Sequence, residues 1–360
     1  MTSPKHFTLG RTFLHPALDY LLVGGGLSLI VVGLAYLGSD GGSADSLLAA
    51  MPLIFLLSNS THFGASTVRL YTKEDSLRTM PFLTMAFPLV VIGVATLAIA
   101  FPAELGRHVT ALFLTWSPYH YAAQAYGLAV MYCYRSGSEL TDGEKRLLWL
   151  CCMVTFARAL IAVPEHGLGI WWILPWSTLG TAAGAQLAID GIVMALAAAA
   201  FALPLIFYVR VSRRQKRPVP AISLLIVLTN AIWFFAFRYV SGMVWATVFH
   251  GIQYLTIVTI FHVKERMRAP GNRRGWAHHT LTFYAASLLL AYLTFQCWPS
   301  AYVLLGFGYV ESSMLVVAVI NIHHFIVDRY IWRLRKDRNY KTVAEAAPHR
   351  EASPGQVVPA

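Results

Sequence analysis

The chain has 360 residues, of which 57% are hydrophobic and only 12% are charged. An ordinary soluble domain has roughly a quarter of its residues charged, and a soluble core with this composition would leave large apolar patches exposed. The composition therefore excludes a conventional soluble protein and predicts one embedded in a bilayer. The formal net charge of +11 does not indicate a nucleic-acid-binding protein. The basic residues lie between apolar runs, where they set topology and contact anionic lipid headgroups.

Apolar runs of about 20 residues, the length that crosses a bilayer as an α-helix, recur along the chain. In chain order, we expect spans near residues 17–37, 47–68, 80–101, 109–132, 147–163, 187–209, 219–237, 243–263, 280–297 and 301–327. The segment GIWWILPW at 169–176 is expected to lie at the interface or to re-enter the membrane. The first 16 residues lack an apolar signal-peptide core, so the first span is expected to act as its own insertion signal. We therefore predict an all-α, polytopic transmembrane helix bundle of about ten spans.

The connectors between these spans alternate in basic charge, which predicts their orientation. Those after the even-numbered spans are rich in Lys and Arg, as in 210–217 and 264–274, whereas 38–46 and 298–300 contain no base. Basic connectors stay on the cytoplasmic side of a membrane, so both termini are predicted to be cytoplasmic. Residues 1–335 are expected to form one membrane domain. The polar, Pro- and Ala-rich segment 336–360 is expected to be a disordered cytoplasmic tail.

Histidines within the spans are the clearest indication of chemistry, because an ionisable side chain in a membrane is costly and commonly functional. Neutral imidazole suits Fe, Zn or Cu, and the four cysteines form no CxxC pair that would favour a soft-ligand site. The principal candidate ligands lie on even-numbered spans beside amide or hydroxyl residues: His62, His120, His250 and His324. Two further candidates are His323 and His15.

Three polar residues follow one of these histidines by four positions, which places them on the same helix face: Gln124, Tyr254 and Asp328. Asp328 is expected to orient His324 as a carboxylate partner of a metal ligand. Gln124 is expected to orient His120 in the same way. Tyr254 is expected to lie near the substrate. Polar faces of this kind cannot point at lipid, so we expect them to converge inside the bundle.

The expected depths of the histidines in the membrane differ. His62 and His324 precede the next basic residue by seven and five residues, whereas His120 and His250 precede it by 15 and 14. At 1.5 Å per residue, the two pairs differ in depth by roughly 12–15 Å. One four-histidine site therefore requires tilted, broken or unequally long helices. Otherwise the chain contains two layers of histidines, one of them near the cytoplasmic face.

The histidine motifs are similar to those of the bacteriorhodopsin-related-protein (Brp/Blh) family. The matching segments are HPALD at 15–19, HFG at 62–64, the aromatic-flanked His250, and the histidine pair at 323–324 before an Asp and a basic exit. Members of that family are membrane enzymes that cleave β-carotene to retinal with oxygen and histidine-bound iron. The resemblance implies a non-haem iron site and a carotenoid or related substrate. In that family a second histidine follows the aromatic-flanked histidine by one helical turn. The residue one turn after His250 in this chain is Tyr254.

Together these features favour an iron-dependent intramembrane oxygenase that acts on a carotenoid, isoprenoid or lipid and keeps a coordination position open for O₂. One alternative is a haem-binding membrane protein with His120 and His250 as axial ligands. Another is a proton-coupled transporter with a histidine relay that includes Arg158 or Glu311, and a structural assembly factor is a further one. We expect an integral protein of a bacterial inner membrane, with membrane lipid and a lipophilic small molecule as partners and no nucleic acid. The sequence does not define the oligomeric state.

Overall fold

The computed structural model describes residues 9–37, 50–73, 75–162, 169–174, 183–236 and 240–332, and these form helices and short connections without any β-strand. The prediction of an all-α protein is therefore confirmed. The predicted tail at 336–360 lies outside the described residues. The principal helices are α1 (Pro16–Leu18), α2 (Gly26–Leu37), α4 (Thr61–Thr72), α6 (Phe87–Ala100), α7 (Arg107–Arg135), α8 (Asp142–Ile161), α9 (Ala183–Gln215), α10 (Ala221–Ala236), α11 (Val240–Met267), α12 (Trp276–Tyr292), α13 (Trp298–Leu304) and α14 (Tyr309–Ile331).

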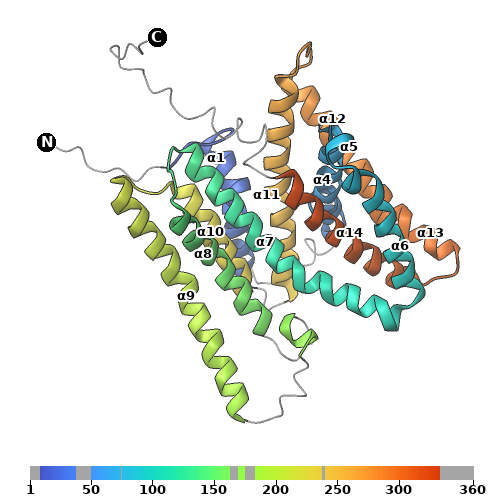
Figure 1. Ribbon diagram of the computed structural model, residues 1–360, viewed down its shortest axis with the longest axis horizontal. Helices are drawn as coiled ribbons and strands as arrows, with labels where there is room; N and C mark the ends of the chain where they lie inside the picture. The colour runs from blue at the N-terminus through green and yellow to red at the C-terminus, as the bar shows by residue number, and fades with distance from the viewer. Residues whose placement is uncertain are drawn as a thin grey trace.

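These helices form two groups joined through the middle of the molecule. In Figure 1, α8, α9 and α10 lie together on one side, and α4, α6, α12 and α13 lie on the other. Helices α7, α11 and α14 occupy the space between the groups, and α7 packs against α8 and α10 of the first group and against α14. The helices that carry the candidate histidines therefore meet at the centre of the bundle.

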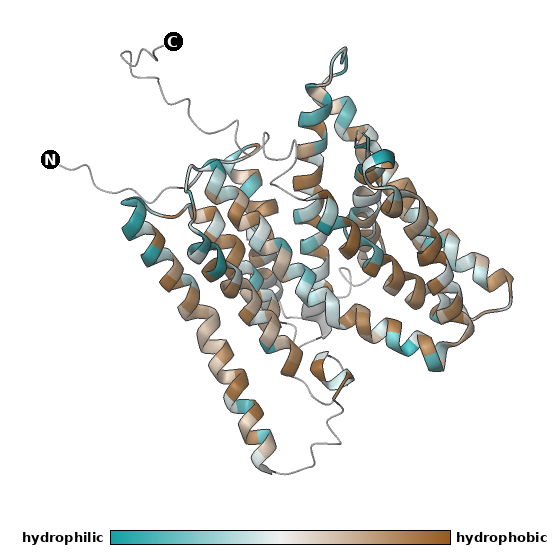
Figure 2. Cartoon of the chain, in the orientation of Figure 1, coloured by the Kyte–Doolittle hydropathy of each residue, from teal (hydrophilic) through white to brown (hydrophobic). Residues whose placement is uncertain are grey.

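Five helices of the described chain are long and apolar enough to cross a membrane: Phe82–Ala100, Gly184–Gln215, Val244–Met267, Trp276–Leu304 and Tyr309–Ile331. Only 11% of the most apolar window of Gly184–Gln215 is buried, as expected for a helix whose surface contacts lipid. Figure 2 shows apolar residues along the middle of the helices and polar residues gathered at their ends. These features support an integral membrane protein.

Two predicted boundaries differ from the structure. The expected span at 17–37 is interrupted, because the π-helical turn η1 (Asp19–Val23) is followed by a break at 24–25 before α2 begins. The connector expected at 298–300 is helical, and the turn instead lies between α13 and α14. Pro299 lies within the continuous helical run Trp276–Leu304, directly after the π-helical turn η8 (Leu293–Cys297).

The segment after α8 folds back onto the bundle as the short 3₁₀ helix η6 (Gly169–Trp172). The indole N–H of Trp171 donates to the carbonyl of Ile161 at 3.3 Å. The indole N–H of Trp172 donates to Nδ1 of His108 at 3.2 Å. Residues 175–176 of the predicted interfacial or re-entrant segment lie outside the described residues.

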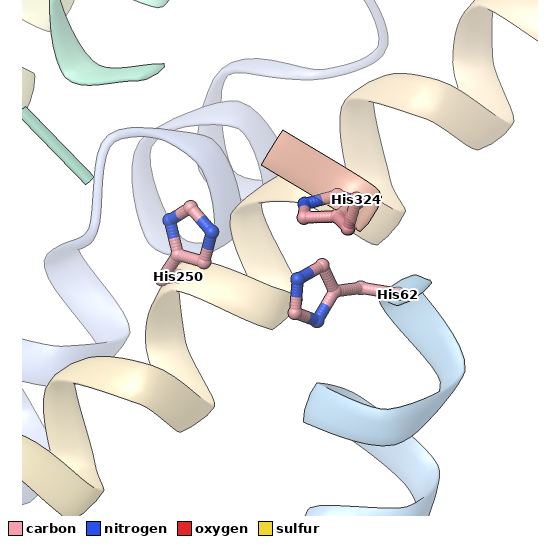
Figure 3. A group of neighbouring side chains, drawn as sticks. All are labelled: His62, His250 and His324. Carbon is pink, nitrogen blue, oxygen red and sulfur yellow. The ribbon is translucent and has the colours of Figure 1, made fainter. Parts of the chain in front are cut away.

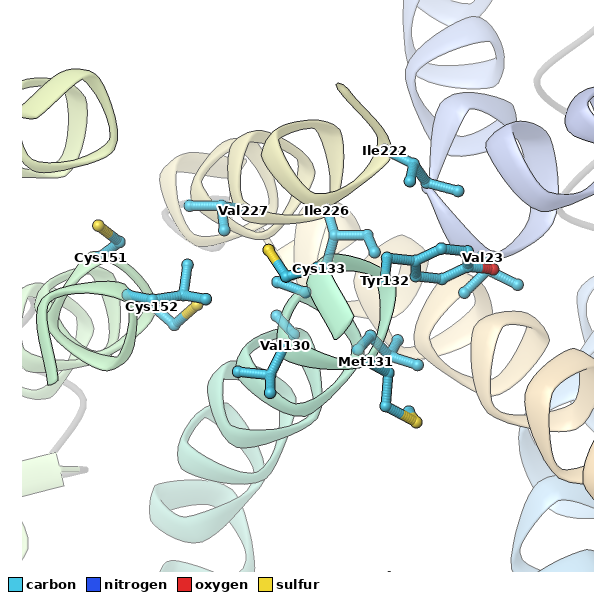
Figure 4. Close-up of a cluster of buried hydrophobic side chains, with 14 of the residues drawn as sticks. Val23, Val130, Met131, Tyr132, Cys133, Cys151, Cys152, Ile222, Ile226 and Val227 are labelled. Atoms are coloured by element: carbon cyan, nitrogen blue, oxygen red, sulfur yellow. The ribbon is translucent and has the colours of Figure 1, made fainter. Parts of the chain in front are cut away.

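The largest hydrophobic core joins α7, α8 and α10 (Figure 4). Tyr132 and Cys133 of α7 pack there with Cys152 of α8 and Ile226 of α10, and all four are fully or almost fully buried. A second core joins α6 and α14. These two cores hold α7 and α14 from opposite sides and so fix the positions of the histidines that these helices carry.

Candidate metal centre

Four histidines from four helices meet in the interior: His62, His120, His250 and His324, which we call the histidine cluster. All are buried, and each imidazole has two neighbours in the cluster. The centroid distances around this closed circuit are 5.3, 5.0, 4.9 and 4.8 Å, with interplanar angles between 73° and 88°. The sequence allowed either one site with all four histidines or two separate layers, and the structure places all four in one site.

Two local features remove the expected difference in depth. Pro118 lies inside α7, two residues before His120, and α7 changes direction part-way along in Figure 1. Proline in a helix interior removes one hydrogen bond and bends the helix. The π-helical turn η2 (Leu56–Ser60) ends just before His62. A single site was expected to require tilted, broken or unequally long helices. The helices that carry His120 and His62 are indeed irregular beside the cluster.

Glycines beside the histidines allow the helix backbones to approach closely. A Cβ at Gly251 would lie 3.1 Å from the Cα of Asn59, so α11 contacts the backbone of η2 directly. A Cβ at Gly64 would meet the backbone carbonyl of Ser287, so α4 packs on α12 in the same way. The first of these contacts places His250 beside His62. The HFG motif therefore contributes packing as well as an imidazole.

Ring nitrogens of the cluster lie close enough to share an ion. His62, His250 and His324 each offer one nitrogen, and these atoms lie within 4.8 Å of one another. Figure 3 shows the three imidazoles around a common space, with a nitrogen of each directed toward it. Nε2 of His120 lies 3.2 Å from Nε2 of His324. Ligand nitrogens at roughly 2.1 Å from one metal ion would lie roughly 3–3.5 Å apart on adjacent positions, so this spacing is compatible with coordination.

Both ring nitrogens of His62 and both of His250 are buried without a hydrogen-bond partner among the described residues. A buried polar atom left without a partner costs about 1–3 kcal/mol. An ion would give one nitrogen of each imidazole a partner. The unpaired atoms therefore fit a metal centre better than they fit ordinary interhelical hydrogen bonding.

Asp328 and Ser66 flank His324 on its two sides. Ser66 Oγ lies 2.9 Å from Nδ1 of His324, and it holds the position that was expected for the carboxylate. Asp328 Oδ2 instead faces the ligand side, 3.5 Å from Nε2 of His324 and 3.9 Å from Nε2 of His120. Its Oδ1 accepts a 2.7 Å hydrogen bond from the hydroxyl of Tyr254. His120, His324 and Asp328 therefore form a second group of potential ligand atoms within 4.8 Å of one another.

Gln124 reaches α11 rather than the imidazole one turn before it. Its Nε2 donates to the carbonyl of His250 and to Oε1 of Gln253, both at 3.4 Å. Gln253 in turn donates to the carbonyl of Val23 at 2.8 Å. Gln124 therefore ties α7 to the helix that carries His250, and it also lines a cavity beside the cluster.

The structure places the two further candidate ligands, His15 and His323, apart from the cluster. His15 is exposed and caps α1, where its Nδ1 accepts from the backbone N–H of Ala17 at 3.3 Å. His323 lies on another face of α14 and stacks on Phe87 at a centroid distance of 5.1 Å. It lines a separate cavity of about 420 Å³. Consecutive helical residues point about 100° apart, which explains how His323 and His324 reach different surroundings.

The sequence reasoning did not select three neighbours of the cluster. Ser66 follows His62 by four residues, so the rule applied to the other histidines would have found it. Phe325 stacks on His120 at a centroid distance of 4.5 Å, and Tyr121 lies 4.3 Å from His250. Both aromatic residues directly follow a candidate histidine, and nothing in their spacing distinguishes them from other apolar residues of a span.

An elongated cavity of about 480 Å³ adjoins the cluster between α7, α11 and α14. It meets the site at His120, Tyr254 and Asp328, and the rest of its wall is largely apolar and aromatic. Cavities of roughly 300–1,000 Å³ with apolar walls and a few polar groups are typical of small-molecule sites. The site therefore combines possible metal ligands with space for a lipophilic molecule.

Fold and site together define an all-helical protein with membrane-spanning helices and a buried histidine cluster able to hold a metal ion. Comparison with protein-family models, curated proteins and solved structures finds no match to this chain. Its function is therefore argued from the geometry of the cluster and the adjoining cavity.

Proposed function

We propose that this chain is an intramembrane oxygenase that uses non-haem iron and acts on a lipophilic substrate. The observation that carries this proposal is the cluster of four buried imidazoles, two of them with unpaired nitrogens, beside an apolar cavity. Imidazole alone suits several first-row metals. Two histidines with one carboxylate, as in His120, His324 and Asp328, are a ligand set typical of non-haem Fe(II) oxygenases.

The residues of the site would divide the work of such a reaction. Either His62, His250 and His324 or His120, His324 and Asp328 would hold the iron, which supplies activation of O₂ when bound. Ser66 fixes the orientation and tautomer of His324 through Nδ1. The hydroxyl of Tyr254 donates to Oδ1 of Asp328 at 2.7 Å beside the cavity, so it could deliver a proton there. The apolar walls of the cavity would orient the substrate and exclude water from the reacting atoms.

The topology we propose is ten spans with both termini in the cytoplasm of a bacterium, in the inner membrane. Helix covers almost all of the described residues in the ten expected spans, and basic connectors alternate with connectors poor in base. We also retain residues 1–335 as one membrane domain. Accessibility of single cysteines introduced in successive connectors would test this topology, and two adjacent connectors on the same side would contradict it.

The substrate class follows from the cavity and from the resemblance to the Brp/Blh family. Both favour an isoprenoid, a carotenoid or another lipid chain that reaches the site from the bilayer.

Haem remains an alternative cofactor. The imidazoles of His324 and His62 lie beside those of His120 and His250 at centroid distances of 4.9 and 5.3 Å, which favours an ion over a macrocycle in that space. A proton relay would use the same histidines without a metal.

The decisive variants are His62→Ala and His250→Ala, with His323→Ala as the matched control. His323 is also a buried histidine of a membrane helix, but it lies outside the cluster. We expect the first two variants to lose bound iron and oxygen consumption with carotenoid or isoprenoid substrates, and the control to keep both. Full iron content in His62→Ala and His250→Ala would overturn the ligand assignment.

A further inference from the structure

The cavity beside the histidine cluster has one cation in its wall. Among the described residues that line it, Arg329 alone is a permanently charged base, and this side chain is exposed. Arginine at the end of a membrane helix commonly extends toward the headgroup region. Here the residue before it, Asp328, faces the cluster, so one turn of α14 connects the possible metal site to the charged end of the cavity.

The cavity is long in one direction. Its wall includes residues of α7 from Trp116 to Met131, which are 15 positions apart and therefore roughly 20 Å along a helix. His120 lies near the first of these residues. Arg329 follows His324 by five residues, or roughly 7 Å along α14. An extended chain with one end at Arg329 would therefore pass the histidine cluster a few atoms from that end.

Further basic residues lie just outside this part of the cavity. Tyr126 lines both the cavity and a neighbouring surface pocket that contains Lys145 and Arg146 of α8. Lys145 is already paired with Asp142 at 3.1 Å, so the local excess of positive charge comes from the two arginines. Asp328, the one carboxylate among the described residues of this wall, is directed at the histidine cluster and at Tyr254, so the charge favours an anionic group beside Arg329 in a largely apolar cavity.

We propose that the substrate of this site is a single-chain amphiphile, acyl or isoprenoid, that ends in a carboxylate. The carboxylate binds Arg329, and the chain lies across the histidine cluster toward Trp116. Arginine binds a carboxylate in a two-point geometry, which would fix the register of the chain relative to the cluster. A cavity of about 480 Å³ suits one chain and is small for a lipid with two chains. This substrate class rests on the proposed function.

The binding experiment uses metal-free protein, so it does not depend on iron. The probes are cis-parinaric acid, a fluorescent single-chain carboxylic acid, and the alcohol with the same chain, detected by energy transfer from Trp116 and Trp332. We expect the wild-type protein to bind the acid about tenfold more tightly than the alcohol. Arg329→Gln should weaken acid binding about tenfold and leave alcohol binding unchanged. Arg273→Gln, at an exposed arginine outside the cavity, should change neither.

A second pair of variants tests whether the chain occupies this cavity. Gly127 lines it, and a Cβ built there meets no atom within 4 Å, so Gly127→Phe should fill the cavity without disturbing the helix. This variant should weaken binding of both probes. Gly93→Phe, at a glycine of α6 that is equally open, should leave both unchanged.

Three results would overturn the proposed substrate class: equal affinity of the wild-type protein for acid and alcohol, equal loss of both in Arg329→Gln, or equally effective displacement by a two-chain anionic phospholipid. Iron without a preference for the acid would refute the substrate class alone. A preference for the acid in protein that binds no iron would refute the proposed function alone.

Discussion

Replacing His62 by leucine should stabilise the metal-free protein while abolishing metal binding. Both nitrogens of this imidazole are buried without a hydrogen-bond partner of good geometry among the described residues, and each costs about 1–3 kcal/mol, or about 2–6 kcal/mol together. The imidazole also packs on Phe63 at a centroid distance of 3.8 Å and on neighbouring imidazoles. Loss of these aromatic contacts offsets about 1–2 kcal/mol. The expected net gain in the free energy of unfolding is therefore up to about 5 kcal/mol.

The assay compares the unfolding of chelator-treated wild-type and His62→Leu protein in one detergent. His323→Leu is the control, because His323 is buried but its nitrogens are not among the buried unpaired atoms. We expect no gain in that variant. Added iron at about a hundredfold excess over its Kd should stabilise the wild-type protein by about 2.7 kcal/mol and leave His62→Leu unchanged. If His62→Leu is no more stable than His323→Leu without metal, the argument from unpaired nitrogens is wrong.

Three further predictions concern the surroundings of the cluster and the N-terminal end of α8. Ser66→Ala should weaken iron binding about 10–100-fold in a titration against a competing chelator, and unchanged affinity would exclude an orienting role for the hydroxyl. Tyr254→Phe should keep its iron but lose about a hundredfold in kcat, and full turnover would exclude proton transfer through this hydroxyl. Burial tends to raise the pKa of Glu144, but hydrogen bonds from Arg214, at 2.7 Å, and from Thr141 outweigh it and hold that pKa below its ordinary value. Glu144→Gln should therefore cost about 1–2 kcal/mol at neutral pH. In melts across pH, the difference should begin to shrink below the ordinary pKa of 4.5 and vanish once the pH is below the lowered pKa of the folded state, whereas a difference independent of pH would refute the ion-pair argument.

The helices could be predicted from the sequence because apolar runs and basic connectors are direct consequences of the bilayer. Their ends were less predictable. The segment WPS at 298–300 contains a proline and no charge, so it was expected to be a connector, yet Pro299 lies in the first turn of α13. The π-helical turn Leu293–Cys297 directly precedes it, and the helical run Trp276–Leu304 continues through the proline. The amino-acid sequence alone does not distinguish such a position from a turn.

The four histidines of the cluster could be chosen from the sequence because each lies on an even-numbered span beside polar residues. Whether these four histidines meet in one site could not be predicted, because that depends on how far the helices bend. Pro118 predicts a bend in α7, but only the packing around that helix determines the direction of the bend. The depth calculation assumed straight helices perpendicular to the membrane.

The roles of the flanking residues depend on contacts between helices. Spacing by four places Gln124 on the face of α7 that carries His120, but its amide donates to the neighbouring helix α11. Asp328 lies on the correct face of α14, yet Ser66 from another helix holds Nδ1 of His324. Periodicity predicts which side of a helix a residue occupies. It does not predict which helix lies opposite.

The most direct test of the proposed iron centre is the metal content of wild-type protein purified without chelator, with an absorption spectrum of the same sample. The proposed centre predicts about one iron per chain and no Soret band, because each of the two possible ligand groups contains His324 and would hold an ion rather than haem. A Soret band in proportion to the iron would assign the histidines to haem. Protein without any stoichiometric metal would contradict the metal centre and leave a proton relay or helix packing as the role of the cluster.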